Sequence, residues 1–251
     1  MDYLEYKPCP NRNERRAVLL IPGGAYYYIG KQDVEKPVEW CHNRHFHVWV
    51  LYYTCAKENK AAYPAPMNEA RAAVKAIRET GRIDILIGWG FSAGAHLLAI
   101  TGTESRLNGM ILSYPVISME NEDITHVLSR NNLLGENATR ELKQQMSAET
   151  RVSDATPPVF IFHTAEDEKV PVRNSLLFAE KMDQFGRPFS LCIQAKGLHG
   201  VGMGDWTGAL DPWLQEVTSG KRLITRSLAP GELELHTKQA LLVQNYKVYD
   251  G

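Results

Sequence analysis

Short runs of apolar residues alternate along the chain with longer segments in which apolar residues recur every three or four positions. The short runs predict β-strands, and the longer segments predict amphipathic α-helices. The expected strands are 17–21, 46–52, 85–89, 109–114, 159–163 and 189–194. The expected helices are 33–43, 67–80, 93–101, 172–185 and 205–217. Such an alternation is typical of a mostly parallel sheet covered by helices on both faces, so the sequence predicts an α/β fold.

Two segments depart from this alternation. Residues 118–156 are polar and rich in Asn, Glu and Thr, and we expect them to form a small cap over the carboxyl edge of the sheet. Residues 219–251 follow the last expected helix and extend beyond the expected core. We otherwise expect a single domain over 1–251, because α/β folds commonly reach this size as one unit.

Charge and composition narrow the class of partner. The chain has 251 residues with 28 basic and 29 acidic side chains, a formal charge of -1, and no long run of either sign. This balance predicts neither a nucleic-acid nor an anionic membrane partner and favours a small substrate of little charge. No apolar segment approaches the roughly 18 residues of a membrane span, and the amino terminus lacks a signal-like pattern, so we expect a cytoplasmic protein. The sequence is compatible with a homo-oligomer.

Cysteine usage does not indicate a structural framework or a metal site. The 4 cysteines are scattered without the spacing of metal ligands, and so few in a chain of this length do not form a disulfide scaffold. Three histidines, His42, His45 and His47, are closely spaced, but no carboxylate or thiolate stands at a convincing partner position. We therefore expect no metal and no organic cofactor.

The strand expected at 85–89 ends in the pattern Gly90-x-Ser92-x-Gly94, and a helix is expected directly after it. In this context the pattern predicts a sharp strand-to-helix turn that exposes a serine as a nucleophile. The flanking glycines keep other side chains away from the turn.

A serine hydroxyl is a weak nucleophile at neutral pH, so Ser92 requires a base and a group that orients the base. Candidates follow two later strands: the acidic turn that contains Asp167, and the loop that contains His199. Both loops leave the carboxyl ends of strands, the edge at which open α/β sheets bind ligands. Glu166 and Glu168 are rivals of Asp167 for the orienting role.

Five motifs in order along residues 15–217 make the chain resemble the α/β-hydrolases, specifically small esterases related to acetyl esterases, acetyl-xylan-type esterases and hormone-sensitive-lipase-like carboxylesterases. The motifs are 20–26 (LIPGGAY), 90–96 (GFSAGAH), 114–116 (YPV), 167–171 (DEKVP) and 198–200 (LHG). The resemblance implies an α/β-hydrolase fold with Ser92 as nucleophile, His199 as general base and then general acid, and Asp167 as the residue that orients His199. It favours Asp167 over its acidic neighbours because Asp-x-x-Val-Pro is the family pattern.

The resemblance also implies an oxyanion hole built from backbone N–H groups. Ala93 would supply one, and the loop after the first core strand would supply others from Gly24 and Ala25. This loop is similar to the family's His-Gly-Gly-Gly segment, with Pro22 in place of the histidine and Ala25 in place of the last glycine. An alanine leaves the N–H available only if its φ is acceptable at that position.

Several aromatic residues near these motifs are candidates for the wall of an acyl- or sugar-binding cleft. The candidates are Tyr26, Tyr27, Tyr28, Trp89, Tyr114 and Pro115. Three consecutive tyrosines cannot all face one core, so at least one is expected at the mouth of the site. Core packing alone also accounts for Trp89, and we expect packing roles for His96 and His163. A cramped cleft would favour short acyl groups such as acetyl.

These residues predict a serine carboxylesterase that hydrolyses small acyl esters, with acetylated carbohydrates as the expected substrates. An arylformamidase or a small peptidase would use the same three residues, and the fold does not separate these activities. A binding protein on a hydrolase scaffold is a third interpretation, which the presence of all three catalytic residue types disfavours.

Overall fold

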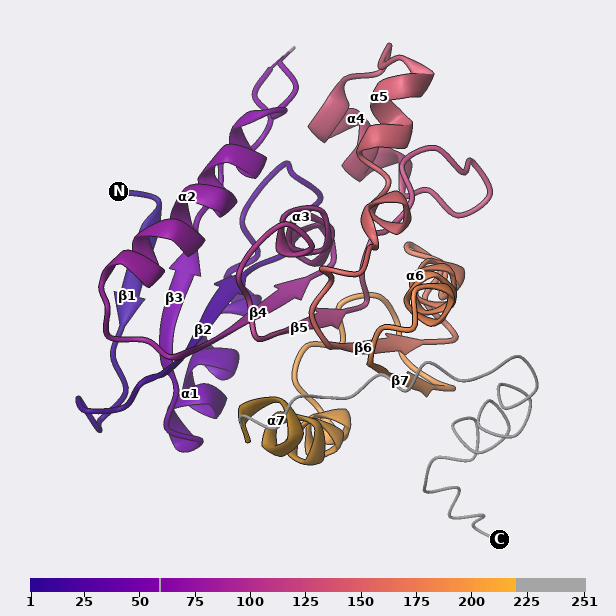
Figure 1. Ribbon diagram of the computed structural model, residues 1–251. Helices are drawn as coiled ribbons and strands as arrows, with labels where there is room; N and C mark the ends of the chain where they lie inside the picture. Colours follow the sequence, from indigo (N-terminus) through magenta and orange to yellow (C-terminus); the bar gives the residue numbers. More distant parts are fainter. Residues whose placement is uncertain (59, 220–251) are drawn as a thin grey trace, which may run out of the picture.

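A seven-stranded sheet runs through residues 1–58 and 60–219, the part of the chain that the computed structural model describes (Figure 1). The strand order is β1-β3-β2-β4-β5-β6-β7, and every neighbouring pair is parallel except the antiparallel pair β1 and β3. The strands are β1 (Leu4–Lys7), β2 (Arg16–Ile21), β3 (His47–Leu51), β4 (Ile85–Phe91), β5 (Gly109–Ser113), β6 (Val159–Thr164) and β7 (Phe189–Gln194).

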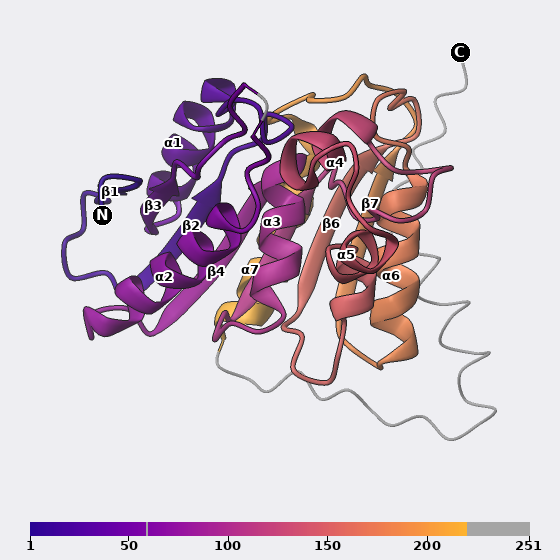
Figure 2. The ribbon, with the colours of Figure 1, turned by 90° about the horizontal axis from the view of Figure 1, so that it is seen from above.

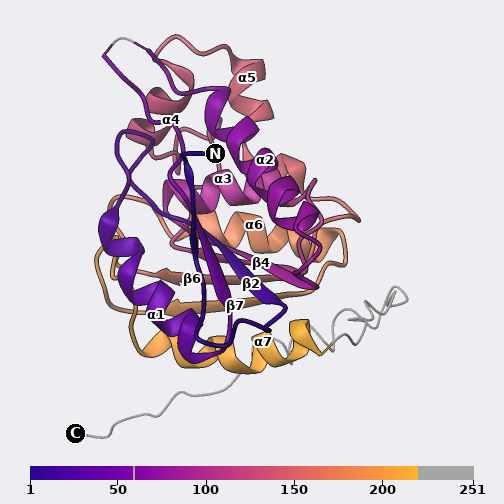
Figure 3. The same ribbon diagram turned by 90° about the vertical axis from the view of Figure 1, so that its left-hand side faces the viewer.

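Helices cover both faces of this sheet. The α-helices are α1 (Glu35–Asn43), α2 (Ala65–Glu79), α3 (Ala93–Gly102), α4 (Val127–Leu134), α5 (Arg140–Gln145), α6 (Arg173–Gln184) and α7 (Leu210–Thr218). Three short 3-10 helices are η1 (Lys31–Asp33), η2 (Ala148–Arg151) and η3 (Asp205–Ala209). Helices α1 and α7 pack on one face, and α2, α3 and α6 pack on the other (Figure 3). Each face has its own apolar cluster.

The central strands are buried on both faces, as expected for a parallel sheet between two helical layers. In β4 every residue after Ile85 is buried, and all of β5 and β6 is buried. Strand β7 lies at the edge of the sheet, and its residues alternate between exposed and half-buried. The motifs after β4, β5 and β6 therefore follow strands whose positions are fixed by burial on both sides, whereas the loop with His199 follows the edge strand β7.

Helix α3 differs from the amphipathic helix that its sequence predicts. All of its residues, 93–102, are buried, because α3 lies between β4, β5 and α2 and is also in contact with η2. A helix that is apolar on all sides is suited to such a central position. Helix α2 keeps the predicted single stripe, with Ala70, Ala73, Val74 and Ile77 buried.

The predicted α/β architecture is confirmed, and each expected strand and helix occurs within a few residues of its expected bounds, except that the helix expected at 205–217 is divided into η3 and α7. The sequence does not predict β1, a four-residue strand with exposed central positions. Residues 118–156 contain α4, α5 and η2, and they lie on the same side of the sheet as α2, α3 and α6 (Figure 2). We call residues 118–156 the insertion. The extension expected at 219–251 lies outside the described residues except for Ser219.

Candidate active site

The turn between β4 and α3 has the geometry of a nucleophile elbow. Ser92 has φ 51° and ψ -116°, a conformation that a residue other than glycine adopts only under strain. A Cβ at Gly90 would lie 2.5 Å from the Cα of Ala95, and one at Gly94 would collide with the backbone oxygen of Ile21. Both glycines are therefore required by the close approach of backbone to backbone.

Three side chains from three loops form a hydrogen-bonded series at this turn. The Oγ of Ser92 lies 2.8 Å from Nε2 of His199, and Nδ1 of His199 lies 2.6 Å from Oδ2 of Asp167. A carboxylate only accepts hydrogen bonds, so Nδ1 carries the proton and Nε2 is free to accept the serine hydroxyl proton. The structure thus brings together the three residues that the sequence singles out.

The carboxylate of Asp167 is held by several donors besides His199. Its Oδ2 lies 3.1 Å from Nε2 of His163, and its Oδ1 accepts the N–H of Val170 at 2.9 Å. His163 is in turn fixed by Ser175, whose Oγ lies 2.7 Å from Nδ1. Burial of Asp167 opposes ionisation, but the hydrogen bonds from His163 and His199 keep its pKa well below its usual range. A permanent negative charge therefore faces the His199 imidazole.

The acidic neighbours of Asp167 point elsewhere. Glu166 is exposed, accepts the N–H of Gly197 at 3.2 Å and lies 3.5 Å from Nζ of Lys196. Glu168 is also exposed. Of the three acidic residues, Asp167 is the one hydrogen-bonded to His199.

The loop after β2 packs directly against the elbow. A Cβ at Gly23 would lie 3.2 Å from the Cβ of Ser92, so the loop approaches the serine closely. Gly24 has φ 125°, and a Cβ there would collide with the carbonyl of Tyr28. Ala25, which replaces the last glycine of the family's loop, has φ 53° and thus adopts the left-handed conformation. Ala93 begins α3, so its N–H has no acceptor within the helix.

Of the neighbouring tyrosines, Tyr26 does not line a cleft, contrary to prediction. Its side chain is completely buried, and its hydroxyl lies 2.7 Å from Nδ1 of His96. Burial lowers the pKa of His96 to about 4, and its Nε2–H donates to the carbonyl of Met146 at 2.7 Å. Tyr27 and Tyr28 are 65% and 55% exposed, so these two rings remain available at the surface.

The other predicted wall residues are also largely internal. Trp89 is completely buried, donates from Nε1 to Oγ of Ser113 at 3.0 Å and stacks on Phe91, so its predicted substrate role is wrong and the core interpretation holds. Pro115 is buried. Tyr114 is buried too, but its ring lies edge-on to His199 with centroids 5.3 Å apart. Tyr114 therefore packs against the catalytic imidazole, and its predicted contact with substrate stays a prediction.

The site also contains a buried carboxyl group, that of Asp33. The sequence does not reveal this role, because Asp33 stands where a helix is expected to begin. It is 4% exposed, and its Oδ2 accepts the N–H of Gly23 at 2.9 Å. Burial raises the pKa of Asp33 to about 6, although the Gly23 N–H and the nearby His199 favour the ionised form. Asp33 therefore holds the loop that carries Gly24 and Ala25.

The insertion contacts the site through both ends of α4. His126 directly precedes the helix, and its ring centroid lies 6.4 Å from that of His199. Near the other end, Nδ2 of Asn132 donates to the carbonyl of Ala25 at 2.9 Å. The sequence predicts neither of these contacts.

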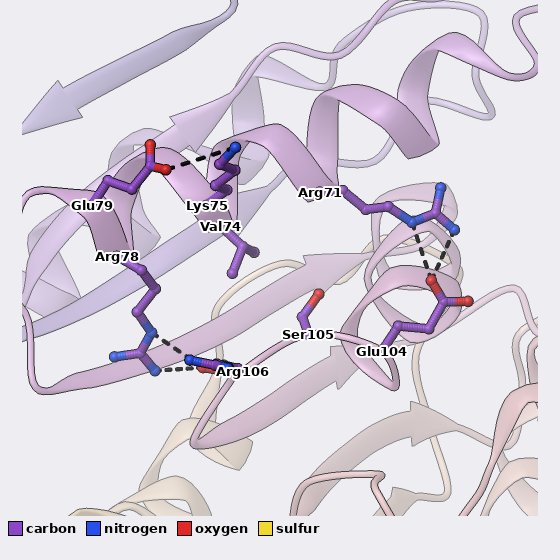
Figure 4. Close-up of a pocket in the computed structure, with 8 residues that line it drawn as sticks. All are labelled: Arg71, Val74, Lys75, Arg78, Glu79, Glu104, Ser105 and Arg106. Carbon is purple, nitrogen blue, oxygen red and sulfur yellow. Dashed lines mark hydrogen bonds and ion pairs between the residues drawn. The ribbon is translucent and has the colours of Figure 1, made fainter.

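A hollow of about 490 Å³ lies elsewhere, between α2 and the loop after α3 (Figure 4). It is lined by Arg71, Val74, Lys75, Arg78, Glu79, Glu104, Ser105 and Arg106. Ser92 precedes the 10-residue helix α3 and Glu104 follows it, which separates them by about 15 Å along the helix axis. Two pairs of charged groups interact here, with Arg71 3.0 Å from Glu104 and Lys75 3.7 Å from Glu79, and Arg78 donates to the backbone carbonyl of Arg106. This hollow is separate from the chemistry at Ser92.

Two further observations concern membrane-spanning helices and cysteines in the described residues. None of the helices in residues 1–58 and 60–219 combines the length and apolar character needed to cross a bilayer. The four cysteines are free thiols: Cys9 and Cys41 are buried, and Cys55 and Cys192 are half-buried.

Comparison with known sequences identifies relatives of this chain. The family model of the prolyl oligopeptidase family matches residues 58–220. Endo-1,4-beta-xylanase B of Butyrivibrio fibrisolvens is 35% identical over 209 residues, which are 75% of this chain and 33% of that protein. The chain therefore spans about a third of the length of this curated relative.

Solved structures share the fold. An acetyl ester-xyloside bifunctional hydrolase from Caldicellulosiruptor lactoaceticus is 30% identical with a TM-score of 0.77, covering 85% of this chain and 87% of its own. A carboxylesterase from Lactobacillus plantarum is 21% identical with a TM-score of 0.71, covering 85% of this chain and 91% of its own. The second similarity concerns the fold alone.

Proposed function

The chain belongs to the prolyl oligopeptidase family, a family of α/β-hydrolases, and from this membership and the geometry at Ser92 we propose that it is a serine carboxylesterase. The proposed reaction is the removal of small acyl groups, acetyl above all, from esters of carbohydrates. The observation that carries the proposal is the continuous series from Ser92 through His199 to Asp167, with distances of 2.8 and 2.6 Å.

In the proposed mechanism the Oγ of Ser92 attacks the ester carbonyl carbon while its proton passes to Nε2 of His199. The charged imidazole is stabilised by the carboxylate of Asp167, which stays ionised. The C–O bond to the alcohol then breaks, and the alcohol oxygen takes the proton from Nε2. Water attacks the acyl-enzyme by the same route and returns the proton to Ser92, which releases the carboxylic acid.

The negative oxygen of each tetrahedral intermediate requires hydrogen-bond donors. We assign this role to the N–H groups of Gly24, Ala25 and Ala93. Three features support the assignment: the loop approaches Ser92 closely, Ala93 stands at the positive end of α3, and the Ala25 backbone is held by Asn132.

The proposed substrate class rests on the relatives. One is a xylanase and another an acetyl ester-xyloside hydrolase, so an acetylated sugar is the substrate that their names suggest for this chain. The two exposed rings of Tyr27 and Tyr28 beside the loop offer apolar faces suited to a sugar ring.

Peptide hydrolysis is a second candidate, because the family model is that of the prolyl oligopeptidases. An arylformamidase would also use the same three residues. The third interpretation, a binding protein without activity, is disfavoured because Ser92 is hydrogen-bonded to Nε2 of His199, whose Nδ1 is hydrogen-bonded to Asp167.

A substrate panel with a Ser92→Ala control tests the proposal. We expect purified protein to release acetate from p-nitrophenyl acetate and from a mono-O-acetylated methyl xyloside. Activity on N-formylkynurenine and on proline-containing peptides should be much lower. Ser92→Ala should reduce kcat by at least about 10⁴-fold without changing the far-UV circular dichroism spectrum. Full activity in this variant, or a preference for the peptides, would contradict the proposal.

The remaining expectations stay predictions. A small ester is the proposed partner, without a metal or organic cofactor and without a nucleic-acid or membrane partner. The cytoplasmic location and a homo-oligomeric state are likewise predictions from the sequence.

A further inference from the structure

A second imidazole lies beside the His199 ring and is not used in the proposed mechanism. His126 comes from the insertion, at the residue that precedes α4. The ring centroids of His126 and His199 are 6.4 Å apart, and the ring planes are inclined by 30°. His126 therefore faces the His199 ring from the insertion side of the site.

The orientation of the His126 ring is fixed by a short hydrogen bond. Its Nδ1 lies 2.7 Å from Oγ of Ser129, a residue with no exposed surface. The other ring nitrogen, Nε2, makes no hydrogen bond to a residue in the described ranges, and the side chain is half-buried. One nitrogen is thus used for positioning, and the other is available to a ligand.

Helix α4 is itself anchored to the catalytic machinery. Asn132 donates from Nδ2 to the carbonyl of Ala25, and its own carbonyl accepts the N–H of Ala62 at 2.9 Å. The helix is therefore tied to the loop on one side and presents His126 to His199 at its beginning. A polar group held on a fixed element in this way is suited to recognition.

His126 is neutral where the enzyme is expected to work. Its pKa is lowered to about 4, mainly by burial and in addition by the nearby His199 and Lys169. The charge of Asp167 acts in the opposite direction. A permanent cation at this position would disfavour the charged form of His199 in the transition state. A neutral imidazole can donate or accept a hydrogen bond without this cost.

The chemistry places the alcohol half of the ester on this side of the site. The departing alcohol oxygen takes its proton from Nε2 of His199, so the alcohol must lie beside that ring. The acyl half instead lies at Ser92 and the loop of Gly24. A group next to the His199 ring on the insertion side is therefore close to the alcohol.

We propose that His126 is a specificity-determining residue whose Nε2 hydrogen-bonds a hydroxyl group adjacent to the ester on a polyhydroxylated alcohol. The inference rests on the proposed esterase function and adds the means by which a sugar ester is selected over a simple ester. A site built to bind a hydroxyl discriminates against an alcohol that lacks one, because its polar group then stays unpaired.

The test compares two acetate esters that differ in the alcohol. One is a mono-O-acetylated methyl xyloside, which carries neighbouring hydroxyls, and the other is p-nitrophenyl acetate, which carries none. We expect His126→Ala to lower kcat/KM for the xyloside by about 5- to 10-fold, the value of one hydrogen bond, and to leave kcat/KM for p-nitrophenyl acetate within about 2-fold. His126→Gln, whose amide reaches a position similar to Nε2, should recover part of the loss.

Val127→Ala is the matched control, because Val127 is the next residue, is 47% exposed and has no polar side-chain atom. It should leave the ratio of the two kcat/KM values unchanged. The rate at which a fluorophosphonate labels Ser92 reports in every variant whether the site is folded. Equal losses on both esters, or no loss on either, in a folded His126→Ala protein would overturn the proposal.

Failure of the underlying function has a different signature. If the unmodified protein cleaves p-nitrophenyl acetate but no sugar acetate, the proposed substrate class and the role of His126 are both wrong. If it cleaves sugar acetates and the His126 variants keep the same preference, only the role of His126 is wrong.

Discussion

At the scale of single residues, backbone strain is concentrated at the site. Four residues at the site, Ala25, Tyr26, Ser92 and Tyr114, have φ values of 53°, 58°, 51° and 39°, and one residue away from it, His45 before β3, has φ 60°. Left-handed conformations cost free energy in residues with a Cβ and persist only where the surroundings enforce them. Each of the four residues at the site belongs to a loop that follows the carboxyl end of β2, β4 or β5. The strain therefore marks the positions where the fold imposes geometry for chemistry.

Asp33 allows a prediction of stability against pH at this scale. Its pKa is raised from 3.8 to about 6, so the folded state binds the proton more tightly than the unfolded state. The contribution of Asp33 to stability is complete below pH 3.8 and is lost as the pH rises through about 6. A shift of this size corresponds to about 3 kcal/mol at most for a fully buried group.

We therefore expect the free energy of unfolding of Asp33→Asn, relative to the unmodified protein, to rise between about pH 4 and 6.5 and to level off above. The asparagine oxygen can still accept the Gly23 N–H, which keeps the loop in place. Urea denaturation at several pH values measures this difference, with the exposed Asp154→Asn as control. A difference that stays flat across this range would show that Asp33 does not titrate as its burial indicates.

At the scale of elements, the elbow is a unit of strand, turn and helix that allows no additional atoms. Gly90 lies against Ala95, and Gly94 lies against the backbone of Ile21 and Pro22, which leads into the proposed oxyanion loop. The turn thus joins the position of the nucleophile to that of the proposed donors. A change in one displaces the other.

Gly94→Ala tests this coupling. The added methyl group meets backbone rather than a flexible side chain, so we expect a loss of about 1–3 kcal/mol in the free energy of unfolding. We also expect kcat for p-nitrophenyl acetate to fall, because Pro22 must move.

Gly208→Ala is the matched control for Gly94→Ala, since a Cβ at Gly208 meets no atom within 4 Å. Its free energy of unfolding should change by less than about 1 kcal/mol. Similar effects of the two substitutions, measured by thermal unfolding and steady-state kinetics, would show that close packing does not maintain the elbow.

At the scale of the whole molecule, the site is assembled from segments far apart in the sequence. The loop after β2, the elbow after β4, the loops after β6 and β7, and the insertion converge at the carboxyl edge of the sheet. Ser92 is 7% exposed as a result. The nucleophile therefore has little room around it.

This convergence predicts a preference for short acyl chains. We expect kcat/KM for p-nitrophenyl acetate to exceed that for p-nitrophenyl octanoate by at least about 10-fold, because each methylene that cannot be accommodated costs transition-state binding. Both esters release the same alcohol, so the comparison isolates the acyl side of the site. Comparable values would contradict a cramped acyl site.

The sequence predicts most of the fold because its signals are local. Strands β2 to β7 are apolar runs, and helix α2 shows a clear stripe, so periodicity identifies them. Strand β1 is missed because a short edge strand buries few side chains and has no such signal. Helix α3 is found as a helix, but burial on all sides depends on its neighbours and not on its own period.

The candidate site likewise has parts that local sequence signals predict and parts that depend on contacts between distant segments. Ser92, Asp167 and His199 could be named in advance, because each stands in a short motif at the end of a strand. By itself the sequence determines the elbow, the order of these residues and the class of fold, since these follow from local turns and periodicity. Only the tertiary structure decides that Tyr26 turns inward to His96, that Asp33 holds the Gly23 loop and that His126 faces His199. Such contacts join residues distant in the chain, and packing selects among them with free energies that no local pattern encodes.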